Sequence, residues 1–109
     1  MLISPSNRLR GDALLLLGRR GIEERFFKAW KQSVESKDPL FVVSALWASQ
    51  EVFKFHRENN PSHLQSNEFV ENMKELMLKL KQSLNKQITS RAQWALDAIV
   101  LNEISQGHQ

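Results

Sequence analysis

Apolar residues recur at helical spacing in five separate segments of the chain. In residues 21–35, for example, the apolar positions follow one another at steps of one, three and four, while charged and amide side chains fill much of the opposite face; the apolar residues are Ile22, Phe26, Phe27, Trp30 and Val34. No segment shows the alternation of apolar and polar residues that a half-buried strand needs. The pattern therefore predicts an all-α fold, a four- to five-helix bundle with short loops in which chain neighbours run antiparallel.

The central helix is predicted over residues 39–57. Asp38 is a favoured N-cap residue, Pro39 suits the first helical position, and the sequence Asn-Asn-Pro at residues 59–61 ends the segment. The first half of this segment is apolar nearly all round, as in helices that lie between other helices or inside an interface. We expect this helix to be too apolar for the rest of so short a chain to cover.

The remaining helix boundaries follow from capping residues and glycines. A first helix is predicted over about Asn7–Leu17 with Gly18 as its stop, and a fourth begins after Ser66 or Asn67. Residues 62–106 contain neither glycine nor proline. A single helix of about 39 residues there would be roughly 58 Å long, too long for this domain. We therefore expect a break within residues 85–90 and a fifth helix at about 90–105, because Ser90 and Gln93 have the spacing of a capping box.

Length and charge indicate one domain with a basic front end. The 109 residues fit a single helical domain, 1–109, in which residues 1–20 could form a separately packed basic N-terminal arm. The net charge is +3, with a balance of +4 in residues 1–31 and −1 in residues 32–109. A basic segment of this kind can attract an acidic protein, nucleic acid or anionic lipid.

Targeting signals are weak. The apolar run over residues 13–17 is too short for a secretory signal, and no run approaches the roughly 20 residues of a membrane span. Because residues 1–20 hold four arginines and one acid, a mitochondrial presequence stays open. The chain has no cysteine, which fits a reducing compartment. We expect an intracellular, cytoplasmic protein.

Several kinds of chemistry are excluded by composition and spacing. Without cysteine there is no disulfide, thiolate nucleophile or cysteine-ligated zinc, and without tyrosine there is no tyrosine acid. His56, His63 and His108 lack the spacing of metal ligands. No nucleophile elbow, S-x-x-K motif or glycine-rich phosphate loop occurs. We therefore expect no enzyme, catalytic residue, metal or cofactor, and the sequence identifies no small-molecule substrate.

The aromatic residues carry the favoured functional hypothesis. Phe26 with Phe27, and Phe53 with Phe55, cannot both face one direction on a helix, so one member of each pair should be partly exposed. Exposed aromatics near methionines are typical of protein-binding grooves. We predict a protein–protein interaction module, an adaptor, chaperone or regulatory subunit that binds a partner protein or forms a homodimer. The predicted contact residues are Phe41, Trp47, Phe53, Phe55, Met73 and Met77.

The alternative hypothesis is a small basic nucleic-acid-binding protein. Phosphate binding needs little more than a strip of cations, and the candidates are Arg8, Arg10, Arg19, Arg20, Lys28 and Lys31. Glu23 and Glu24 stand at the start of the second predicted helix, where a helix-turn-helix reader would approach phosphates, and they disfavour that mode. Non-specific binding is the form of this hypothesis that stays open.

Overall fold

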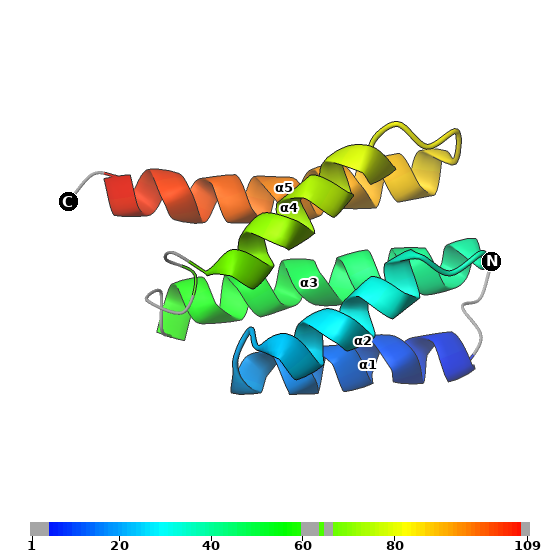
Figure 1. Ribbon diagram of the computed structural model, residues 1–109, viewed down its shortest axis with the longest axis horizontal. Coiled ribbons are helices and arrows are strands. Elements are labelled where there is room, and N and C mark those ends of the chain that lie inside the picture. Colours follow the sequence, from blue (N-terminus) through cyan, green and yellow to red (C-terminus); the bar gives the residue numbers. More distant parts are fainter. Residues whose placement is uncertain (1–4, 60–63, 65–66, 108–109) are drawn as a thin grey trace.

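The computed structural model describes the backbone of residues 5–59, 64 and 67–107, and the side chains of residues 9–59, 64 and 67–99. This part of the chain is helical and contains no strand (Figure 1). Its helices are α1 (Pro5–Arg20), α2 (Glu24–Val34), α3 (Pro39–Asn59), α4 (Glu68–Leu80) and α5 (Lys86–Gly107). The predicted all-α bundle with a central helix from Pro39 is thus confirmed.

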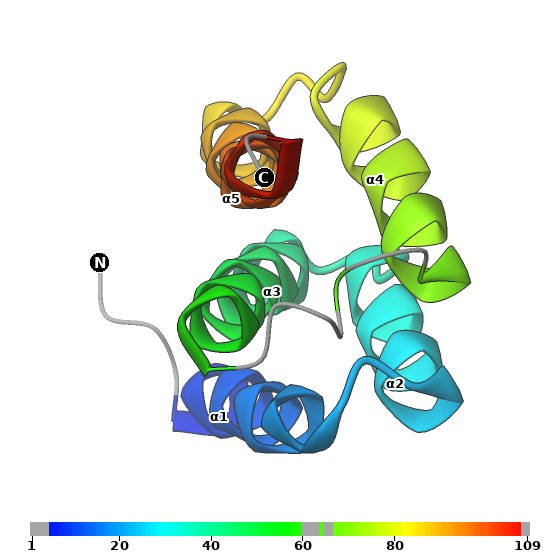
Figure 2. The same ribbon diagram turned by 90° about the vertical axis from the view of Figure 1, so that its left-hand side faces the viewer.

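The helices form two layers. Helices α1, α3 and α5 lie side by side with α3 in the middle, and all three begin at the same end of the molecule, so they are parallel to one another (Figure 1). Helices α2 and α4 run back across one side of this row (Figure 2). Chain neighbours therefore run in opposite directions, as predicted, while the parallel three-helix row is a feature that the sequence pattern did not indicate.

Helix α3 contributes the largest share of the core. Its buried residues are Val42, Ser44, Ala45, Leu46, Ala48, Ser49, Val52, Phe53 and His56. Trp30 of α2 is fully buried and donates a hydrogen bond from Nε1 to the carbonyl oxygen of Ala45, at 3.1 Å. Burial of each large apolar side chain stabilises the fold by about 1.5–3 kcal/mol. The expectation that the rest of the chain cannot cover α3 is wrong for most of its circumference, because α1, α2 and α5 each pack against a different side of it.

Helix α1 continues through Gly18, where a stop was expected. It ends at Arg20, and Gly21 follows with φ +153°, a conformation that side chains disfavour. A Cβ atom built on Gly18 would lie 2.4 Å from Val52 Cγ2 and 2.9 Å from Phe26 Cε1. Gly18 is therefore required by the close approach of α1 to α2 and α3, which the local sequence does not reveal. Residues 5–20 pack along α3 as part of the bundle, so no separate arm forms there.

Asparagine side chains begin the last two helices. The Oδ1 atom of Asn67 accepts from the backbone N–H groups of Phe69 and Val70, which confirms the predicted cap of α4. The break between α4 and α5 occupies residues 81–85, slightly before the expected position. The cap of α5 is Asn85, whose Oδ1 accepts from the N–H of Gln87 at 2.9 Å. The predicted capping box at Ser90 is wrong, since Ser90 lies inside α5.

Candidate interaction surface

One side of α3 faces away from α2 and α4 and lies between α1 and α5. Its residues follow at alternating steps of three and four, as one helix face requires, and none of them is fully buried; they are Leu40, Val43, Trp47, Gln50, Lys54 and Arg57. The first three are apolar and the last three are polar or positively charged. The open side of α3 therefore changes from apolar to basic along its length.

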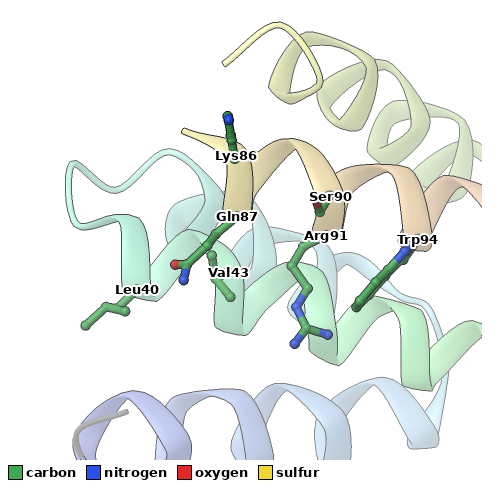
Figure 3. A pocket seen from close by; sticks show the side chains of 7 residues that line it. All are labelled: Leu40, Val43, Lys86, Gln87, Ser90, Arg91 and Trp94. Carbon is green, nitrogen blue, oxygen red and sulfur yellow. The ribbon is translucent and has the colours of Figure 1, made fainter. Parts of the chain in front are cut away.

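A groove runs along the line where α3 and α5 meet. Its larger part has a volume of about 420 Å³ and is lined by Leu40, Val43, Lys86, Gln87, Ser90, Arg91 and Trp94. Figure 3 shows Gln87, Arg91 and Trp94 extending from α5 toward α3, while Lys86 stands at the rim and points the other way. We call this hollow, together with its smaller continuation, the α3–α5 groove.

The continuation lies on the other side of Trp94. It has a volume of about 210 Å³ and is lined by Gln50, Lys54, Arg57, Trp94, Asp97 and Ala98. Trp94 thus borders both parts of the groove, and 49% of its surface is exposed. The guanidinium carbon of Arg91 lies 4.7 Å from the centre of the Trp94 ring, a cation–π contact within α5.

Positive charge predominates in the α3–α5 groove. Its two parts together are lined by four cationic side chains and one carboxylate, Asp97. Asp97 accepts a hydrogen bond from Gln93 Nε2 at 2.8 Å. At ordinary salt concentrations, the electrostatic field of an exposed charge extends about 8–10 Å into solvent. The groove therefore combines an apolar wall with a positive electrostatic potential.

Three of the predicted partner-binding residues are buried. Phe53, Met73 and Met77 each have 0% exposure and belong to the core of the single chain, so their prediction as surface residues is wrong. The sequence did not distinguish them because cores and interfaces use the same aromatic and thioether side chains. The inference that one member of each Phe pair is partly exposed is confirmed, since Phe27 and Phe55 are half-buried while Phe26 and Phe53 are buried.

The other three predicted contact residues are half-buried beneath α1. The guanidinium carbon of Arg10 lies 4.1 Å from the ring centre of Phe41, and that of Arg19 lies 5.4 Å from the ring centre of Phe55. Trp47 packs beside Gly11, where an added Cβ atom would lie 3.5 Å from the indole ring. These contacts use much of the aromatic surface that α3 turns toward α1. Leu40 and Val43, the other half-buried apolar residues of this side of α3, line the groove beside α5.

The cations of the nucleic-acid hypothesis lie on two helices, α1 and α2. Arg10 and Arg19 lie nine residues apart on α1, about 13 Å along the helix axis, and each covers a different ring of α3. Lys28 Nζ lies 2.9 Å from Glu24 Oε1 on the exposed face of α2. Arg20 and Lys31 are exposed, and the side chain of Arg8 lies outside the described residues.

The described residues also bear on catalysis and membrane insertion. His56 is buried and donates from Nε2 to the carbonyl oxygen of Gly18 at 2.8 Å, so it ties α3 to α1. His63 and His108 lie outside the described residues. Among the residues that the structure does describe, no group of three or more His, Asp and Glu side chains could hold a metal ion. None of the helices, over the same residues, has the length and apolar character to cross a bilayer.

Trp94 and Arg91 are the surface residues that sequence reasoning missed. The sequence signal that could have identified Trp94 is its position around the helix. Ala92, Ala95 and Ile99 follow the buried stripe of α5, and Trp94 stands outside it. A large aromatic residue outside the apolar stripe of its helix is exposed unless another element covers it. Arg91, three positions earlier, is its neighbour on the same helix face.

Comparisons of the chain with protein-family models, with curated proteins and with solved structures find no match.

Proposed function

We propose that this chain is a non-catalytic protein-interaction module that binds a partner protein through the α3–α5 groove. The observation that carries the proposal is the half-exposed indole of Trp94, which borders both parts of a groove with Leu40 and Val43 in its wall. Tryptophan and arginine are enriched among the residues that dominate binding energy at protein interfaces. Adaptors, chaperones and regulatory subunits use surfaces of this kind.

The exposed part of Trp94 is large enough to contribute substantially to binding. A tryptophan side chain presents about 200 Å², so an exposed fraction of 49% leaves roughly 100 Å² open to solvent. At about 25 cal/mol per Å², covering this surface contributes roughly 2.5 kcal/mol. That magnitude is typical of a residue whose truncation strongly weakens an interface.

Site-specific photo-cross-linking tests the proposal. A photoreactive amino acid replaces Gln87, which is exposed and lines the groove, in cells that naturally express the chain. Gln32, exposed on α2 in the other layer, is the matched control position. We expect a discrete protein adduct from position 87, none of the same mass from position 32, and loss of the adduct when Trp94→Ala is added.

The outcome is informative in either direction. The same adducts from both positions would show that cross-linking reports only random encounters. An adduct from position 87 that survives Trp94→Ala would show that the indole does not carry the contact. Because Trp94 is 49% exposed, the variant should retain the helical circular-dichroism spectrum of the parent, which separates loss of binding from loss of fold.

A further inference from the structure

We infer that the occupant of the α3–α5 groove is an acidic amphipathic segment of the partner protein. This inference rests on the proposed function and specifies the chemistry of the partner. The proposed occupant is a peptide segment with apolar side chains on one face and Asp or Glu residues beside them. The argument comes from the distribution of charge, the shape of the apolar wall and the length of the groove.

Charge complementarity is the first step. Arg91 from α5 and Lys54 and Arg57 from α3 line the groove around Trp94, and Lys86 stands at its rim. The single carboxylate of the lining, Asp97, is engaged by Gln93 Nε2 at 2.8 Å. Helices α3 and α5 begin at the same end of the molecule (Figure 1). Leu40 and Lys86, from their first turns, line the larger hollow, so the positive ends of both helix dipoles lie beside it. A partner that carries carboxylates matches this potential, and a basic partner would be repelled.

The apolar wall indicates the second property of the occupant. Leu40, Val43 and the indole of Trp94 lie on the two sides of the larger hollow (Figure 3). Its volume of about 420 Å³ can accept one or two apolar side chains. An acidic segment without apolar residues would leave this wall exposed to water. The occupant must therefore present both kinds of side chain on the face that meets the groove.

The length of the groove suits a short helix. Along α3 the groove extends from Leu40 to Arg57, which corresponds to about 26 Å at 1.5 Å per residue. An amphipathic helix of about 17 residues spans the same distance. Docking of such a helix with apolar residues at steps of three and four is a common mode of peptide recognition.

A second copy of this chain fits the groove less well. In a two-fold dimer the groove would face the same groove of the other copy, so that each copy would bring four cationic side chains and one carboxylate to the contact. Juxtaposed like charges disfavour association. A single-stranded nucleic acid also fits less well, because it needs successive aromatic platforms and a row of cations. The lining of the groove offers one aromatic ring, Trp94, and the Arg91 guanidinium already lies over it.

The test uses defined peptide pools and charge-reversal variants. Three fluorescent pools of peptides about 17 residues long carry Leu, Ile or Phe at helical spacing, and their other positions are Asp/Glu, Lys/Arg or Ser/Gln. Fluorescence anisotropy measures their affinity for the parent chain, for Lys54→Glu with Arg91→Glu, and for Trp94→Ala. The control is Arg25→Glu with Lys31→Glu on the exposed face of α2, which makes the same change in net charge away from the groove.

We expect the acidic pool to bind the parent at least tenfold more tightly than the basic pool, and to weaken as salt rises. Lys54→Glu with Arg91→Glu should weaken binding of the acidic pool about tenfold, since each exposed ion pair contributes modestly and the reversal turns attraction into repulsion. The control should differ from the parent by less than about twofold. Trp94→Ala should also weaken the acidic pool, because it removes the apolar contact. Circular dichroism confirms that each variant is folded.

Other outcomes overturn the inference. Equal binding of the acidic and basic pools, or affinities weaker than about 1 mM for all pools, would reject an acidic occupant. If the cross-link from position 87 still depends on Trp94, the proposed function survives that rejection. A mixed oligonucleotide pool that binds more tightly than the acidic peptides would assign the groove to nucleic acid. A dimer in light scattering that Trp94→Ala abolishes would assign it to a second copy.

Discussion

Two glycines of α1 should respond in opposite directions when each is replaced by alanine. In a helix interior, Gly→Ala stabilises by about 1 kcal/mol because it reduces the conformational freedom of the unfolded chain. At Gly11 the new methyl group would meet Trp47 at 3.5 Å, an ordinary van der Waals distance, so this gain is retained. At Gly18 it would lie 2.4 Å from Val52 Cγ2 and 2.9 Å from Phe26 Cε1.

The contacts at Gly18 determine the size of its effect. Val52 and Phe26 have 0% and 1% exposure, so neither side chain can move into solvent to make room. Overpacking of a core costs about 1–3 kcal/mol, and contacts this short belong at the upper end. After the gain in helix propensity is subtracted, Gly18→Ala should lower the free energy of unfolding by about 2 kcal/mol, while Gly11→Ala should raise it by about 1 kcal/mol.

Thermal and denaturant unfolding followed by circular dichroism measures both effects. We expect a Tm about 8 °C lower for Gly18→Ala and about 4 °C higher for Gly11→Ala. Val52→Ala in the Gly18→Ala background removes the obstructing methyl groups. The loss in free energy of unfolding caused by Val52→Ala should therefore be at least about 1 kcal/mol smaller in the Gly18→Ala background than in the parent. The reasoning is refuted if Gly18→Ala stabilises as Gly11→Ala does, or if the effects of Gly18→Ala and Val52→Ala simply add.

Three further substitutions test the capping, core and surface assignments by the same unfolding measurements. Asn67→Ala should cost about 1–2 kcal/mol, because it removes the cap of α4 and the 3.1 Å hydrogen bond from Nδ2 to the Ile22 carbonyl oxygen; an unchanged stability would contradict this role. Phe53→Ala should cost about 3–5 kcal/mol, clearly more than Phe55→Ala, since Phe53 is fully buried and Phe55 is half-buried; equal losses would reject the assigned burial. Trp94→Ala should lower the free energy of unfolding by about 2 kcal/mol, because about half of the indole is covered within the chain and the cation–π contact is lost; a loss as large as that of Phe53→Ala would mean that the indole serves mainly the fold.

Local features of the sequence predicted local features of the structure. Asp38 caps α3 by accepting from the N–H of Leu40 at 3.0 Å, and Asn67 caps α4, because a cap depends on residues within one turn. The helix stop predicted at Gly18 is wrong because the role of Gly18 depends on a residue far away in the sequence. Its role depends on Val52, which lies 34 positions later in the chain. A glycine that ends a helix and a glycine that admits a neighbouring helix look the same in one sequence.

The sequence predicted the type of the candidate surface but not the residues that form it. The pattern of α3 identified an apolar helix with an open side, but which flank stays open depends on the parallel row of α1, α3 and α5. That row comes from the paths of the connections and the second layer, which hydrophobic periodicity does not encode. Phe53, Met73 and Met77 were therefore assigned to the surface although they fill the core. Trp94 became recognisable as a surface residue once α5 was placed.

The position of α3 between α1 and α5 makes it the shared support of both flanks. Helices α1 and α2 form the N-terminal flank, and α4 and α5 form the C-terminal flank. The two flanks are joined mainly through α3, and directly by a smaller contact between α2 and α4. Proteins assembled from neighbouring units in this way open in parts, and the amides of a loosened part exchange with solvent before the rest. A ligand seated across the junction of α3 and α5 would hold the C-terminal flank in place. Hydrogen-exchange protection of α5 would then rise with occupancy, so recognition at the groove and order in the last third of the chain are thermodynamically linked.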